Sequence, residues 1–114
     1  MRLVLVILAA TAFLAPLLAS PSAARAEEHT ISIGDRDFEP KEIKIRPGDT
    51  VTWVNDDDRD HTVVSDEDSE ESFDSGKIRA GKSFSHTFEK AGTFEYHCKY
   101  VLRLKGKIIV KEEE

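Results

Sequence analysis

The stretch SFSHTFEKAGTFEYHC, from Ser83 to Cys98, is the part of the sequence that decides the fold class. Polar and apolar residues alternate across 83–88 and again across 93–98. Alternation with a period of two is typical of β-strands that bury one face. Ala91-Gly92 supplies turn chemistry between the two segments. This stretch therefore predicts two short strands separated by a turn.

Similar patterns recur along the chain from Glu27 onward. Pro47-Gly48-Asp49 is a predicted turn, because proline presets one backbone dihedral and glycine accepts a positive φ. No segment shows a convincing long helical period. About seven short strands at close spacing predict an all-β sandwich. The further strand segments are 31–33, 43–45, 50–55, 61–65 and 106–112.

Residues 1–26 have the pattern of a secretory signal peptide. Arg2 precedes an apolar run of 17 residues that ends at Ala19, and Ala24-Arg25-Ala26 offers small residues for cleavage before Glu27. The run is shorter than the ~20 residues that comfortably span a bilayer. We therefore expect a cleaved leader, with an uncleaved membrane anchor as the alternative, a periplasmic or secreted protein, and no membrane attachment after cleavage.

The remaining 27–114 are long enough for one small domain with a modest core. The chain of 114 residues has a net charge of -6, and the part after the leader has 22 acidic and 14 basic side chains. This balance argues against nucleic-acid binding. No paired acid and base or activated nucleophile stands out, so we expect no enzyme. The composition favours a monomeric binding or carrier domain.

Residues 56–74 hold ten acidic side chains and a single arginine. Charge runs of this kind are usually solvated, mobile loops. Alternatively, the segment steers a basic redox partner during encounter, which would make association sensitive to salt. The sequence leaves both interpretations open.

Cys98 is the only cysteine, so it cannot form an internal disulfide. It is an inert buried thiol, an intermolecular bridge or a metal ligand. Strand parity places Cys98 on the same face as Phe94 and Tyr96, at the end of the buried face. His61 shares parity with Val63 and can also point inward at a sheet end. A soft thiolate beside an imidazole suits copper.

Three stretches resemble the cupredoxins, the small blue-copper proteins of plastocyanin and amicyanin type. They are VTWVNDDDRDHTVVS from 51, AGKSFSHTFEKAGTFEYHCKY from 80 and KGKIIVK from 105. The resemblance covers about 31–111. It implies an exported Greek-key β-sandwich that binds copper and transfers single electrons. By position, His61 and Cys98 correspond to the first histidine ligand and the thiolate, and Asn55 to a residue that orders the ligand loop.

The segment CKYVLRLKG, from Cys98 to Gly106, departs from the family pattern. Val101 stands where the family has its second histidine ligand, and Leu104 where it has the weak axial methionine. The axial bond is long and mainly tunes the potential, whereas the loss of an equatorial imidazole removes a strong bond. The resemblance therefore implies a weakened or altered copper centre held by His61 and Cys98.

The other histidines are poor substitutes for the missing ligand. His97 has the wrong parity, His86 is not brought to the sheet end, and His29 is most simply a solvated residue near the start of the mature chain.

Two alternative functions remain open. One is a metal-free interaction domain in which Val101, Leu102 and Leu104 fill the former site. The other is a two-ligand Cu(I) protein that passes metal to a partner.

Overall fold

The computed structural model describes residues 26–112, so the predicted leader lies almost entirely outside the described residues. Eight strands and no helix are found within that range. Accordingly, no helix there is long and apolar enough to cross a membrane. The strands are β1 (Glu28–Ile33), β2 (Phe38–Glu39), β3 (Glu42–Ile45), β4 (Asp49–Asn55), β5 (Val64–Ser65), β6 (Ser83–Phe88), β7 (Gly92–His97) and β8 (Lys105–Val110).

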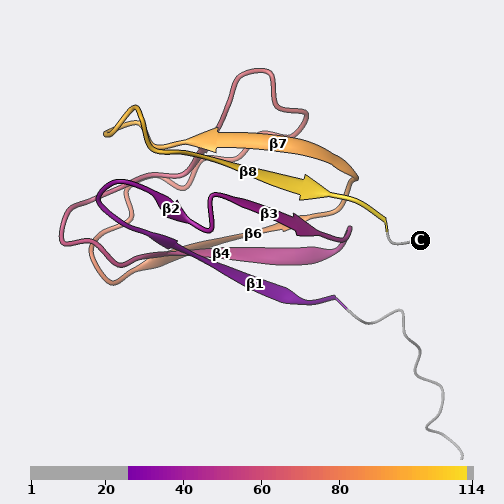
Figure 1. Cartoon of the computed structure of the whole chain (residues 1–114), viewed down its shortest axis with the longest axis horizontal. Helices are drawn as coiled ribbons and strands as arrows, with labels where there is room; N and C mark the ends of the chain where they lie inside the picture. The colour runs from indigo at the N-terminus through magenta and orange to yellow at the C-terminus, as the bar shows by residue number, and fades with distance from the viewer. Residues whose placement is uncertain (1–25, 113–114) are drawn as a thin grey trace, which may run out of the picture.

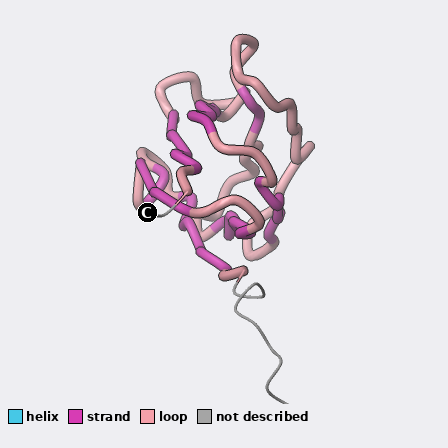
Figure 2. The backbone as a smooth tube through the Cα atoms, turned by 90° about the vertical axis from the view of Figure 1, so that its right-hand side faces the viewer, coloured by secondary structure: helices cyan, strands magenta, loops and turns pink. Residues whose placement is uncertain are grey.

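The strands form two four-stranded sheets packed face to face. The first sheet has the order β2-β1-β4-β6 and the second has β3-β8-β7-β5. Figure 1 shows β7 and β8 in one layer and β1 and β4 in the other, and Figure 2 shows the strands surrounding the interior. Pairs β1–β4 and β3–β8 are parallel, and the other pairs are antiparallel. The predicted β-sandwich is confirmed, with the short β2 as an additional strand.

The core is built from the inward faces of β4 and β7. Trp53 is fully buried, and its ring centroid lies 5.3 Å from that of Tyr96 and 6.0 Å from that of Phe73. Phe94 and Phe88 continue the cluster, with centroids 5.4 Å apart. Each fully buried large apolar side chain contributes roughly 1.5–3 kcal/mol. The alternation in the two sequence segments therefore reflects real burial on one face.

Tyr96 and Gly106 make a close cross-strand contact in the second sheet. They are paired in register between β7 and β8, and the phenol ring lies over the glycine. A Cβ at position 106 would overlap the Tyr96 hydroxyl and ring. Glycine is therefore required here for space, so that the phenol can reach the core.

The predicted strand 61–65 is only partly formed. Val64–Ser65 pairs with β7, whereas His61 makes an isolated bridge to Ile78 through backbone hydrogen bonds of 3.1 and 2.8 Å. Because 61–63 leave the sheet, burial does not alternate there: His61, Thr62 and Val63 are all buried. The prediction that His61 points inward is nevertheless confirmed.

The acidic segment 56–74 is anchored to the sandwich and does not form a free loop. Phe73 is only 7% exposed and belongs to the core. The backbone of Phe73 exchanges hydrogen bonds with Ser65. Nε2 of His86 lies 2.9 Å from Oε2 of Glu71. Phe73 and the Glu71–His86 contact therefore tie the segment to the sheets, while most of its acidic side chains are exposed, as expected for a solvated segment.

Candidate metal centre

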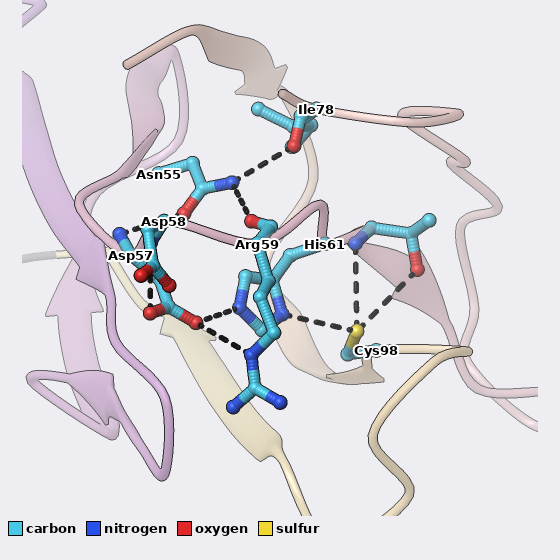
Figure 3. A network of polar contacts seen from close by, with 8 residues as sticks. Asn55, Asp57, Asp58, Arg59, His61, Ile78 and Cys98 are labelled. Atoms are coloured by element: carbon cyan, nitrogen blue, oxygen red, sulfur yellow. Dashed lines mark hydrogen bonds and ion pairs between the residues drawn. The ribbon is translucent and has the colours of Figure 1, made fainter. Parts of the chain in front are cut away.

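His61 and Cys98 meet at one end of the sandwich, where β7 ends. Nδ1 of His61 lies 3.6 Å from Sγ of Cys98, and both side chains are fully buried. Figure 3 shows the sulfur on one side of the imidazole and Asp57 on the other. The two residues come from segments that are 37 positions apart in the chain. The predicted convergence of an imidazole and a sulfur is present in the structure.

Asp57 fixes the orientation of the His61 ring. Its Oδ2 lies 2.8 Å from Nε2 of His61. The hydrogen bond from His61 holds the pKa of the Asp57 carboxyl below its usual value, so the oxygen accepts and Nε2–H donates. The other ring nitrogen, Nδ1, faces Cys98: it offers a lone pair to a metal when the ring is neutral and donates to the thiolate when the ring is protonated. Such outer carboxylates are the usual means of selecting the histidine tautomer in metal sites.

Asn55 orders the loop that carries Asp57 and His61. Its Nδ2 donates to the carbonyls of Arg59 at 2.7 Å and Ile78 at 2.9 Å, and its Oδ1 accepts from the Asp57 N–H at 2.9 Å. The side chain is fully buried, and each of its polar atoms is used. Asn55 thus joins β4, the loop and the strand-like segment at Ile78, in agreement with the loop-ordering role that the family resemblance implied.

The surroundings of Cys98 favour its thiolate form. Burial by itself raises the pKa of the thiol, but the N–H of Thr62, the His61 ring and the N–H groups of Val101 and Tyr100 together hold the pKa below its ordinary value. The Thr62 N–H lies 3.5 Å from Sγ. A thiolate, and not a thiol, is the form of cysteine that binds metals.

The arrangement of thiol, imidazole and carboxylate resembles that of a cysteine nucleophile activated by histidine. However, Cys98 is 0% exposed, so a substrate cannot reach its sulfur. Burial is the largest single influence on His61 and lowers its pKa. The hydrogen bonds and charges of Asp57 and Cys98 together exceed that effect, so the pKa of His61 lies above its usual value. His61 and Cys98 each favour the charged form of the other, and together they place a nitrogen and a sulfur donor side by side in the interior.

The donor atoms fit a small transition-metal ion. Ligand nitrogen and sulfur atoms bond such ions at about 2.0–2.3 Å, so two ligands of one ion lie roughly 3–4 Å apart. The separation of 3.6 Å between Nδ1 and Sγ falls in this range. One imidazole and one thiolate are a soft donor set that favours copper over hard cations.

The loop after Cys98 contributes no further nitrogen or sulfur side chain to this site. Leu104 is fully buried, and Val101 is partly buried against the core. Leu102 is 73% exposed and Tyr100 is 53% exposed. The expectation that Leu102 helps to fill the site is therefore wrong, because its side chain points to solvent.

Each of the other histidines pairs with a carboxylate elsewhere. His29 contacts Asp49 at 3.0 Å, His86 contacts Glu71 at 2.9 Å and His97 contacts Asp66 at 2.6 Å. His97 points away from Cys98 as its parity predicts. The expectation of a solvated His29 is wrong, since its side chain is only 21% exposed and lies against a buried aspartate.

Sequence reasoning missed two contributors to the site, Asp57 and Thr62. Asp57 is one of three consecutive aspartates, and nothing in the run DDDRDH distinguishes it from its neighbours. Its spacing of four residues from His61 was the available signal. Thr62 places its N–H against the sulfur, and its Oγ1 accepts from the Lys99 N–H at 2.8 Å. Any residue except proline could place a backbone N–H against the sulfur, so the sequence gives no signal for that contact.

The family model described as a cupredoxin-like domain matches residues 4–110. The chain belongs to the cupredoxin-like family. The resemblance seen in the strand sequences is thus confirmed over nearly the whole chain, and so is the fold that it implied.

Cupredoxins from bacteria and algae are among the similar proteins. Amicyanin from Paracoccus denitrificans is 32% identical over 71% of this chain, and the match spans 63% of that protein's length. Amicyanin-alpha from Methylorubrum extorquens is 30% identical over 90% of this chain and 88% of its own length. Plastocyanin from Scenedesmus fuscus is 38% identical over 54% of this chain and 70% of its own length.

Solved structures agree with these relatives. A Cu(I) form of an amicyanin variant is 30% identical with a TM-score of 0.67, covering 72% of this chain and 80% of that one. A purple cupredoxin from Nitrosopumilus maritimus is 28% identical with a TM-score of 0.66, covering 72% of this chain and 98% of that one. The prediction of copper as cofactor agrees with the Cu(I) form of the amicyanin variant.

Proposed function

We propose that the chain is an exported copper protein of the electron-carrier type, in which His61 and Cys98 are the protein ligands of an altered centre. The observation that supports this most is the separation of 3.6 Å between Nδ1 of His61 and Sγ of Cys98. Asp57 presents the correct ring nitrogen, and three N–H groups stabilise the thiolate. These features prepare both donors before an ion arrives.

When bound, copper supplies one-electron chemistry by cycling between Cu(I) and Cu(II). The chain's own part is to hold the donors in place. His61 is fixed through Asp57, and Cys98 is fixed by β7 and by the hydrogen bond from its N–H to the Leu104 carbonyl at 3.0 Å. A rigid donor set limits the rearrangement that accompanies a change of oxidation state. This rigidity is what an electron carrier requires.

The centre differs from one with two histidines because Val101 offers no nitrogen. A soft ion such as Cu(I) accepts few ligands, so the pair retains copper affinity in the reduced state. Cu(II) would need a further ligand, which water, a backbone carbonyl or a partner's side chain would have to supply. Leu104 is fully buried and would offer copper no donor atom. We infer a copper site with lower Cu(II) affinity and weaker colour than that of a complete centre.

Two surfaces suit a redox partner. Tyr100 and Leu102 are the exposed large apolar side chains of 26–112, and they flank Val101 beside the site. The second surface is the acidic segment 56–74, in which seven of the ten acidic residues are exposed. We propose that a basic partner is steered by this segment and docks on the apolar loop.

Export with cleavage between Ala26 and Glu27 would deliver the protein to the periplasm or to the extracellular space.

Copper handling is the second candidate, favoured by the two-donor site. A carrier that delivers Cu(I) needs a site that a partner can complete and then empty. One imidazole and one thiolate leave a position for a partner's ligand, but both side chains are fully buried, so transfer would require the residues that cover them to move. The burial of Leu104 and Val101 instead favours a metal-free interaction domain. The three functions differ in how they respond to copper.

Titration of the mature domain with Cu(II) and, anaerobically, with Cu(I) separates the functions. The carrier predicts a sulfur-to-copper charge-transfer band in the visible spectrum that disappears in Cys98→Ser and His61→Ala. His86→Ala is the matched control, because His86 also pairs with a carboxylate but lies away from the site. Tight Cu(I) uptake without the band would favour metal handling. Absence of any binding that depends on Cys98 would contradict both copper functions.

A further inference from the structure

A second group of metal-binding side chains lies at the opposite end of the sandwich from His61 and Cys98. Ligand atoms of Glu27, His29 and Asp49 lie within 4.8 Å of one another. This group sits where β1 and β4 begin, whereas the His61 loop follows the end of β4. Strands of six or seven residues at about 3.3 Å per residue separate the two ends by roughly 20 Å. In Figure 1 the start of β1 lies far from the end of β7.

Asp49 already uses its carboxylate within the protein. Oδ2 accepts from Nε2 of His29 at 3.0 Å and from the Arg46 N–H at 3.0 Å, and Oδ1 accepts from the Glu27 N–H at 2.9 Å. The side chain is only 3% exposed. Withdrawing it toward a metal would break three hydrogen bonds to a carboxylate, which are stronger than those between neutral groups, although their donors are exposed or half-buried. A chelate built from the Glu27 and His29 nitrogens would release Asp49 from those two partners but would leave it the hydrogen bond from the Arg46 N–H.

The order Glu27-Glu28-His29 supplies those nitrogens once the leader is cut after Ala26. The new chain then begins with a free amine and has histidine as its third residue. In such a peptide the amine, the next two amide nitrogens and the histidine Nδ1 form three fused chelate rings around one ion. The four nitrogens lie in a plane, and Cu(II) and Ni(II) are the ions that prefer this tetragonal arrangement.

We propose that the mature amino terminus, Glu27-Glu28-His29, is a second metal site that binds Cu(II) or Ni(II) through four nitrogens. The proposal rests on the cleavage site proposed above and is independent of the centre at Cys98. Binding displaces one proton from the terminal ammonium and one from each of the two amides, and all three go to solvent. The metal is neither oxidised nor reduced.

Chelation breaks the hydrogen bonds from Glu27 and His29 to Asp49, but the ligands lie at the very start of β1, where little else is disturbed. Glu28 and His29 pair with Thr50 and Val51 at the start of the β1–β4 ladder, and the Thr50 N–H donates to the Glu27 carbonyl at 3.0 Å. Chelation turns these first residues out of the ladder. The ends of strands open most easily. The buried anchor of β1 begins at Ile31, which is fully buried and two residues beyond the last ligand.

The test uses the full chain, exported with its leader and carrying Cys98→Ser so that the sulfur site is silent. Mass spectrometry of the purified protein first reports where the mature chain begins. Titration with Ni(II) near neutral pH is then expected to give about one yellow, diamagnetic square-planar complex per chain. Because that complex is diamagnetic, NMR can follow the Thr50 amide, which is expected to lose its protection from hydrogen exchange.

Three variants separate the chelate from a carboxylate site. His29→Ala is expected to lose the complex, as is the insertion of one glycine before Glu27, which moves the histidine to the fourth position and leaves Asp49 in place. Asp49→Asn is expected to retain it. Loss of binding in Asp49→Asn with retention after the glycine insertion would overturn the proposal in favour of side-chain ligands. A mature chain that starts anywhere other than Glu27 would overturn it at the cleavage step, leaving the copper centre at Cys98 unaffected.

Discussion

Asp57 Oδ2 and His61 Nε2 are 2.8 Å apart, so a carboxylate four residues earlier in the same loop decides which ring nitrogen faces Cys98. The hydrogen bond leaves Nδ1 directed at the sulfur, 3.6 Å away. Donor orientation at this site is thus set by an outer residue that contacts neither sulfur nor metal. The order of influence runs from Asn55, which holds the loop, to Asp57 and then to the imidazole.

Asp57→Ala is expected to weaken copper binding by roughly 10–100-fold while the domain stays folded, because the imidazole loses its fixed orientation. Competition titration against a chelator of known affinity measures the change. Asp58→Ala is the matched control, since Asp58 neighbours Asp57 but has no side-chain contact to His61 among the hydrogen bonds of 26–112. Equal affinity in the Asp57 variant and the wild type would show that this outer carboxylate does not act on the site.

Val101→His combined with Leu104→Met is expected to create or strengthen an intense visible band with Cu(II). The substitutions restore an imidazole and a thioether at the positions where the family carries them. Val101 already packs against the core beside the site. Leu102→His with Leu104→Met is the matched control, because the side chain at 102 points to solvent. A double variant, Val101→His with Leu104→Met, that folds but stays colourless would refute the positional match.

Gly106→Ala is expected to destabilise the domain by about 1–3 kcal/mol, in the range found for overpacked cores. The added methyl group would overlap the Tyr96 hydroxyl across β7 and β8. Gly34→Ala is the control, because a Cβ at position 34 meets only ordinary contact with the Asp37 carbonyl. Chemical denaturation of the two variants measures the difference, and similar stabilities would contradict the close contact.

Asp49→Asn is expected to lower the free energy of unfolding by about 1.5–3 kcal/mol near neutral pH, as for hydrogen bonds to charged groups. Burial raises the pKa of Asp49, but hydrogen bonds from Glu27, Arg46 and His29 outweigh burial and hold the pKa below the ordinary 3.8. A depressed carboxyl pKa stabilises the fold above the unfolded value, and this stability is lost as the pH falls through the folded pKa.

The stability gap between wild type and Asp49→Asn should therefore be full at neutral pH and shrink as the pH falls below 3.8. Denaturation at a series of pH values between neutral and strongly acidic solution tests this. A gap that stays constant, or grows as acid is added, would mean that the carboxylate is not stabilised by its charge.

The alternation of side chains predicted most of the fold because burial on one face requires a period of two. Phe94, Tyr96 and Cys98 all lie inside, as their parity indicates. The pattern failed at 61–63, where the chain leaves the sheet and three consecutive side chains are buried. The alternation of inward and outward side chains holds only for residues that are paired in a β-ladder. It therefore does not predict burial in loops that fold over the end of a sandwich.

The acidic segment shows a second limit of sequence reasoning. Its charge predicted solvation, and most of its acidic residues are indeed exposed. One aromatic residue, Phe73, nevertheless anchors it in the core, and His86 holds Glu71. A single buried side chain outweighs the average composition of a segment, because its apolar area leaves water while the neighbouring charges remain hydrated. Composition alone does not reveal which residue takes that role.

The central claim is that His61 and Cys98 bind the same copper ion. X-ray absorption at the copper edge tests it most directly in the mature wild type and in His61→Ala, each loaded with one equivalent of Cu(I) so that the amino-terminal Cu(II) or Ni(II) site stays empty. The account predicts a sulfur and an imidazole nitrogen around copper in the wild type, at the distances of about 2.0–2.3 Å usual for such ligands, with loss of the imidazole in the variant. Copper surrounded only by nitrogen and oxygen, without sulfur, would contradict it.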